Sequence, residues 1–194
     1  GIANWSDEKI LVEMMRYVAT FGDGHTRLSL PKISRPRLQL FLFEEGIYVT
    51  SAHSDHRGLV GKKLVEVEGK PIEAIFPMVE PLMSIDNSQD VKSFLPNYVT
   101  NPTILRGLGM KVETDKINLT FQSEDGTKET VAVPCSTDFQ PKPDWINFPR
   151  NSEVLTLKAR DKNYWFEYLP EQKAMYFQYN RISNDKDESV TKFA

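Results

Sequence analysis

Residues 22–26, with the sequence GDGHT, separate two segments of different periodicity, and this change constrains the fold more than any other feature. Before the pentapeptide, apolar residues recur at helical spacing and predict a helix over residues 6–21. Ser6 is suited to cap its start, and Gly22 tolerates a left-handed end. The helical stripe that we expect to pack in a core consists of Ile10, Leu11, Met14, Met15, Val18 and Phe21.

After the pentapeptide, apolar residues alternate with a period of two, which is typical of strands. Residues 38–43 predict a strand with two largely apolar faces, followed by a turn at 44–46 and a strand over 47–50. Such a strand is either covered on both sides or exposes a face for a partner. Further predicted elements are strands at 64–67, 117–121, 130–133, 154–157, 164–169 and 174–179, and helices at 72–78 and 88–98.

This order of elements predicts a mixed α+β chain in three segments. We expect a helical segment over residues 1–34, a compact module of strands and helices over 35–135, and a connector with new strands over 136–194. Pro134 is expected to end the module, and the proline-rich stretch 139–149 to be irregular. The last segment has the character of an unfinished domain.

Composition excludes several classes of function. The 24 Lys and Arg are interleaved with 27 Asp and Glu, so nucleic acid is an unsuitable partner. No apolar run is long enough for a membrane span. Cys135 is the only cysteine, which excludes an internal disulfide and thiolate zinc sites. His53, Asp55 and His56 could ligate a metal, but we expect a solvated loop there, and no metal or cofactor.

Residues 38–133 resemble a PDZ-like module of the bacterial kind, because residues 58–72 are similar to its usual "GL.G..L..V.G.P." run. With residues 23–26 before this module and 175–182 after it, the succession resembles the carboxyl-terminal processing peptidase and tricorn-core superfamily of serine peptidases, in its tricorn-like branch. The resemblance implies a PDZ-like domain over 35–135 and the truncated start of a crotonase-like α/β catalytic domain within 136–194. It also implies a location in the cell envelope or outside the cell.

The resemblance implies that His25 is the general base of a serine peptidase. The tricorn pattern has a serine where this chain has Gly24, so no role of that serine is transferred. The processing-peptidase branch uses a serine and lysine pair, in which case His25 would be structural, as it would be if it only capped the turn. No plausible Gly-x-Ser-x elbow occurs in the sequence, so we expect the nucleophilic serine to be missing and this fragment to be inactive alone.

The PDZ-like resemblance also implies a peptide or protein substrate that is bound by strand addition, with its carboxyl terminus as the candidate point of contact. The docking edge would be the strand 38–43, including Leu38 and Leu40, with Arg35 and Arg37 placed to bind the carboxylate. The arginines could instead be exposed linker charges. Aromatic residues are frequent after residue 140, and we expect them to pack in an interior and not to line a cleft: Trp145, Trp165, Phe166, Tyr168, Tyr176, Phe177 and Tyr179.

Two other functions stay open. The chain could be a PDZ-like scaffold that only binds peptides, or a non-catalytic relative that binds small apolar ligands such as retinoids. The sequence leaves the oligomeric state open.

Overall fold

The computed structural model describes residues 2–28, 34–137, 144–149, 154–185 and 189–193. The chain divides into two compact units, residues 1–148 and 149–194, and each is described by itself. Both are built from helices and antiparallel strands, so the mixed α+β class is confirmed. Among the described residues, no helix combines the length and apolar character that a membrane span requires.

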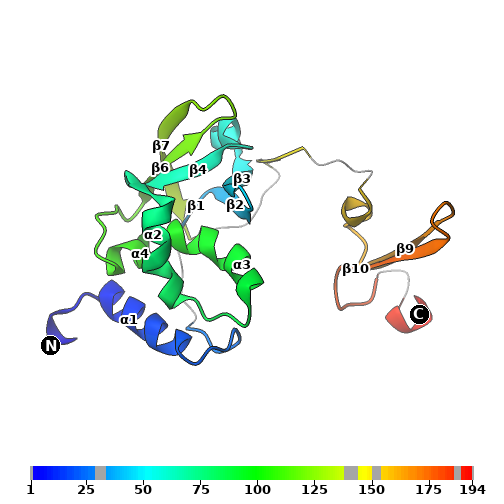
Figure 1. The fold of residues 1–194 in the computed structure, drawn as a ribbon, viewed down its shortest axis with the longest axis horizontal. Coiled ribbons are helices and arrows are strands. Elements are labelled where there is room, and N and C mark those ends of the chain that lie inside the picture. The colour runs from blue at the N-terminus through cyan, green and yellow to red at the C-terminus, as the bar shows by residue number, and fades with distance from the viewer. Residues whose placement is uncertain (1, 29–33, 138–143, 150–153, 186–188, 194) are drawn as a thin grey trace. The chain divides into compact units, whose positions relative to one another are not determined.

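The first unit is organised around a twisted antiparallel sheet with the strand order β1-β7-β6-β4-β3-β2 (Figure 1). The short strand β5 pairs with β4, and β8 pairs with β3. The strands are β1 (Arg35–Pro36), β2 (Leu38–Phe43), β3 (Gly46–His53), β4 (Lys63–Val67), β5 (Lys70–Pro71), β6 (Lys116–Gln122), β7 (Lys128–Ser136) and β8 (Trp145–Asn147).

Within the described residues of this unit, four helices accompany the sheet, and short 3₁₀ turns connect the elements. The helices are α1 (Asp7–Ala19), α2 (Ile72–Val79), α3 (Ser88–Val99) and α4 (Pro102–Gly107). The 3₁₀ turns of the unit are η1 (Ile2–Asn4), η2 (Ser54–Leu59) and η3 (Glu80–Leu82). Inward-facing apolar residues of the sheet, such as Ile47, Leu64 and Phe121, join residues of the helices, such as Ile75 and Leu105, in one core.

The predicted helix over 6–21 is confirmed as α1. Ser6 caps it by accepting a hydrogen bond from the backbone N–H of Lys9 at 3.2 Å. The predicted core stripe is only partly right. Met14 and Phe21 are at least half exposed, whereas Val12, outside the predicted stripe, is fully buried beside Met15. The reason is tertiary packing: α1 packs on α4 and η3, and the positions of these neighbours determine which face of α1 is buried.

Most of the predicted sheet is confirmed, with two corrections. The strand β2 alternates as expected, with a register shift between Gln39 and Leu40. Pro134 does not end the hairpin, because β7 continues to Ser136 and there pairs with β1. Likewise, residues 145–147 of the expected irregular connector form β8, paired with β3. A prediction made from one segment alone does not reveal that a distant strand is available for pairing.

The second unit contains the strands β9 (Tyr164–Leu169) and β10 (Ala174–Tyr179), which form an antiparallel pair. Both strands were predicted. Residues 154–157 are not a strand, because Leu155–Leu157 form the 3₁₀ turn η4 and no described strand pairs with them. The helix α5 (Val190–Phe193) follows.

The aromatic residues of the second unit are only partly interior, contrary to the expectation. Trp165 is buried and contacts Tyr176, with ring centroids 5.4 Å apart. On the other face, Phe166 and Phe177 lie opposite each other, and each is 56% exposed. Two strands have two faces, and within the described residues α5 covers this face only in part through Phe193.

Candidate active-site turn at His25

The turn that carries His25 follows directly from the way α1 ends. Beyond Ala19 the chain reverses at Gly22, whose φ of +64° is a left-handed conformation that glycine adopts without strain. Asp23 then organises the next residues. Its carboxylate accepts the backbone N–H of His25 at 3.0 Å and the hydroxyl of Thr26, and its carbonyl oxygen accepts the Thr26 N–H. These bonds fix the backbone around His25.

The same bonds act on the charge of Asp23. The Thr26 hydroxyl, and after it the His25 backbone amide, lower the pKa of the Asp23 carboxyl below its usual value. Each bond favours the ionised form, which is the better acceptor. The turn therefore carries a carboxylate at neutral pH.

Asp86, far away in the sequence, completes the turn. It lies just before α3, and its Oδ1 accepts the Gly24 backbone N–H at 2.6 Å. The approach is so close that a Cβ on Gly24 would stand 2.7 Å from Asp86 Oδ2. Only glycine therefore fits here without displacing the Asp86 carboxylate.

The His25 imidazole lies beside these two carboxylates. Its Nδ1 is 3.6 Å from Asp23 Oδ1 and 3.7 Å from Asp86 Oδ2, which are ion-pair distances slightly longer than a hydrogen bond. The side chain is 89% exposed, and within the described residues no group bonds to Nε2. The ring therefore presents one nitrogen to anionic oxygens and the other to solvent.

Asp23, His25 and Asp86 could also hold a metal ion, since their ligand atoms lie within 4.8 Å of one another. All three donors are partly or largely exposed, and exposed acidic groups commonly lie together without an ion. His53, which the sequence offered as a possible ligand, contacts two carboxylates instead. Its Nε2 is 2.7 Å from Asp144 and its Nδ1 is 3.1 Å from Asp55.

The residues predicted to bind a peptide differ in their burial and in their position in the sheet. Leu38 is 3% exposed and Leu40 is packed against the core, so their side chains are part of the interior. Arg35 lies in β1 and not in a linker, and Arg37 connects β1 to β2. A peptide at this strand would consequently contact the β2 main chain.

The edge of β2 is suited to such contacts. Within the described part of the chain, β2 pairs with β3 alone, at the end of the sheet. The helix α3 packs beside β2. A strand edge next to a helix can accept one more extended segment, with main-chain bonds to the edge and side chains against the helix.

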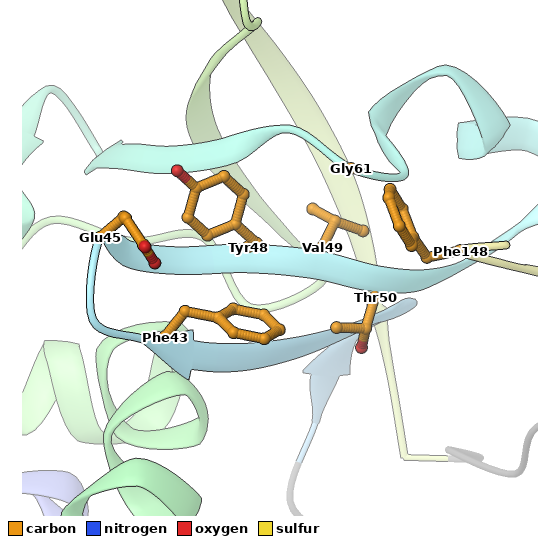
Figure 2. A pocket seen from close by; sticks show the side chains of 7 residues that line it. All are labelled: Phe43, Glu45, Tyr48, Val49, Thr50, Gly61 and Phe148. Carbon is orange, nitrogen blue, oxygen red and sulfur yellow. The ribbon is translucent and has the colours of Figure 1, made fainter. Parts of the chain in front are cut away.

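A small apolar cavity of about 270 Å³ lies on the β3 side of the β2–β3 hairpin (Figure 2). The rings of Phe43 and Tyr48 meet edge to face there, with centroids 5.8 Å apart, and the Phe148 ring stands over Gly61. The cavity is lined by Phe43, Glu45, Tyr48, Val49, Thr50, Gly61 and Phe148.

Cys135 is not suited to act as a nucleophile. Burial raises the pKa of its thiol to about 12, and the nearby charge of Asp115 acts in the same direction. Because the thiolate is the reactive form, the thiol is inert at neutral pH.

Neither protein-family models nor curated proteins match the sequence. One solved structure of similar fold is that of mature CPAF complexed with lactacystin, with 16% sequence identity and a TM-score of 0.48. The match covers 76% of this chain and 29% of that chain, so this chain spans less than a third of its length. At these values the likeness is a partial similarity of fold and says nothing about activity.

Sequence reasoning named His25 but missed Asp86. The available signal was the pattern at the start of α3, where Asn87 and Asp90 form a capping box. That pattern correctly predicts a fixed loop before the helix. It does not predict that the loop meets a turn 62 residues earlier in the chain.

Proposed function

We propose that this chain is the N-terminal portion of a serine peptidase of the tricorn-like branch and that His25 is its general base. The observation that carries the proposal is the His25 imidazole, exposed at Nε2 and flanked by two carboxylates at Nδ1. A carboxylate on one nitrogen favours a proton there and leaves the other nitrogen as an acceptor. The family resemblance of residues 23–26 and of the module after them supports the same role.

The proposed chemistry uses both nitrogens. A serine hydroxyl transfers its proton to His25 Nε2 while its oxygen bonds to the scissile carbonyl carbon. The imidazolium then gives that proton to the leaving amine as the C–N bond breaks, which leaves an acyl-enzyme. Water repeats the sequence, and its hydroxyl displaces the serine oxygen. The carboxylates of Asp23 and Asp86 stabilise the imidazolium that forms between the steps.

In this proposal the nucleophilic serine belongs to a part of the protein outside these 194 residues, so the fragment alone is inactive. The PDZ-like module over 35–135 presents the substrate, and residues 136–194 lead into the catalytic domain. A location in the cell envelope or outside the cell belongs to the same proposal.

The test is His25→Ala in the full-length protein that contains this chain. We expect peptide hydrolysis and labelling by a serine-directed fluorophosphonate to fall by about 10²-fold or more, because general-base catalysis contributes about 10²–10⁴-fold. His56→Gln is the matched control, since it removes a histidine from η2, outside the turn. Unchanged hydrolysis and labelling in His25→Ala would reassign this histidine to structure and refute the proposal.

A second candidate function is peptide capture alone, and the open edge of β2 beside α3 favours it. A peptide would add as a strand to β2, and its terminal carboxylate would lie near Arg37. This function needs no serine and can be measured on the chain as it stands.

Three peptides test this candidate on the chain itself. A free carboxyl-terminal peptide should bind, its amidated form should bind more weakly, and a form with methylated backbone amides should lose strand pairing and affinity. Arg37→Ala should reproduce the loss seen on amidation, while Arg57→Ala, at an exposed position of η2, should not. If none of the peptides binds, peptide capture is wrong. Retinoid binding in the same experiment would favour the apolar-ligand alternative, for which the cavity of about 270 Å³ is small.

A further inference from the structure

Asp23 and Asp86 both lie beside His25, but their carboxylates are engaged to different extents. Asp23 Oδ1 accepts the His25 backbone N–H, and its Oδ2 accepts the Thr26 side-chain hydroxyl, so both oxygens accept hydrogen bonds within the turn. Asp86 Oδ1 accepts the Gly24 N–H, whereas Asp86 Oδ2 faces the imidazole at 3.7 Å. Only Asp86 has an oxygen that is not used by the turn itself.

Asp86 is also held firmly by α3. Its backbone N–H donates to Asp90 Oδ2 at 2.8 Å, and Asn87 in turn caps α3 by accepting the Gln89 N–H at 2.8 Å. Asp90 closes the capping box with the Asn87 backbone. The main chain of Asp86 is thus fixed at the start of α3, and its carboxylate approaches the exposed ring from outside the turn, whereas the carboxylate of Asp23 belongs to the same short turn as the ring.

We propose that Asp86 is the positioning residue of His25: it holds the proton on Nδ1, directs Nε2 outward and ties the imidazole to the start of α3. This inference rests on the proposed function only for its catalytic consequence. The orientation of the ring is a property of this chain and is measurable without any peptidase activity.

The spectroscopic test uses the two ring nitrogens of His25, observed by ¹⁵N NMR of the 194-residue chain with labelled histidine. In the parent chain at a pH where the ring is neutral, the Nδ1–H tautomer should predominate. In Asp86→Asn, the amide oxygen can still accept the Gly24 N–H, while the NH₂ group faces Nδ1 and favours the Nε2–H tautomer. The tautomer populations should therefore shift toward Nε2–H.

Two further variants keep this test decisive. Gly24→Ala adds a methyl group 2.7 Å from Asp86 Oδ2 and should shift the tautomer in the same direction by displacing the carboxylate. Asp125→Asn removes the same charge in the turn between β6 and β7 of the same unit, where Asp125 bonds to Thr127, and should leave the His25 signals unchanged. If both Asp86→Asn and Gly24→Ala keep the parent tautomer, the inference is wrong.

Kinetics of the full-length protein then separate the two proposals. Asp86→Asn should lower kcat at least about tenfold with little change in KM, since a wrong tautomer removes the base without removing substrate contacts. If His25→Ala abolishes activity but Asp86→Asn changes neither kcat nor the tautomer, only the role of Asp86 fails. If Asp86→Asn shifts the tautomer but His25→Ala leaves activity intact, Asp86 orients a histidine that is not catalytic, and the proposed function fails.

Discussion

Gly107 of α4 lies directly against the backbone of Glu8 in α1. A Cβ on Gly107 would come within 2.3 Å of the Glu8 carbonyl oxygen and within 2.5 Å of a Val12 methyl group. The two helices can cross this closely only because position 107 has no side chain. The crossing is reinforced by Arg106, whose Nε is 3.2 Å from the Glu8 carboxylate. Since α1 leads into the turn of His25, this contact positions the helix from which that turn begins.

We therefore expect Gly107→Ala to destabilise the protein by about 1–3 kcal/mol, because an overpacked contact forces the helices apart. Urea unfolding followed by circular dichroism measures this loss. Gly58→Ala is the matched control: nothing lies within 4 Å of its Cβ, and its backbone is not left-handed, so its stability should change little. Equal stability of the two variants would show that α1 and α4 separate without cost.

The helix crossing also shows what the sequence could and could not predict. Local signals such as the Ser6 cap, the Gly22 reversal and the alternation in β2 predicted where elements begin and end. The buried face of α1 depends on a glycine about 100 residues away, so the predicted stripe was partly wrong. The contact of Gly24 with Asp86 likewise joins residues far apart in the sequence, so local patterns do not predict it. The sequence could name His25 as a candidate because it lies in a local motif, whereas Asp86 joins the candidate site only through tertiary packing.

Glu68 offers a test of a strained position. Its φ is +50°, a left-handed conformation that costs an ordinary residue about 1–2 kcal/mol. Its carboxylate compensates by accepting the backbone and side-chain N–H groups of Asn118, both at 2.9 Å. Glu68→Ala loses these bonds and keeps the strain, whereas Glu68→Gly loses the bonds and the strain. Unfolding experiments should find the alanine variant about 1 kcal/mol less stable than the glycine variant. The reverse order would contradict the assigned backbone conformation.

Cys135 should react slowly with a thiol reagent in the native protein. With a pKa of about 12, only about one thiol in ten thousand is ionised near pH 8. The rate of reaction with dithiobisnitrobenzoate should rise by orders of magnitude in guanidinium chloride, where burial is lost. Fast reaction under native conditions would show that the β1–β7 region around Cys135 opens readily.

His56 should give the protein a pH dependence of known sign. Burial lowers the pKa of its imidazole below 6.5, and the charges of His53 and Arg37 act in the same direction against the opposing effect of Asp55. At pH values between the His56 pKa of the folded protein and that of the unfolded chain, the unfolded chain binds more protons. The stability of the fold therefore falls as the pH drops from above about 6.5 through the pKa of the folded state. An NMR titration should place the His56 midpoint below 6.5. In His56→Gln, the free energy of unfolding should decline less over this range. A midpoint above 6.5, or the same decline in His56→Gln as in the parent, would show that the ring is solvated and that another group sets the acid sensitivity.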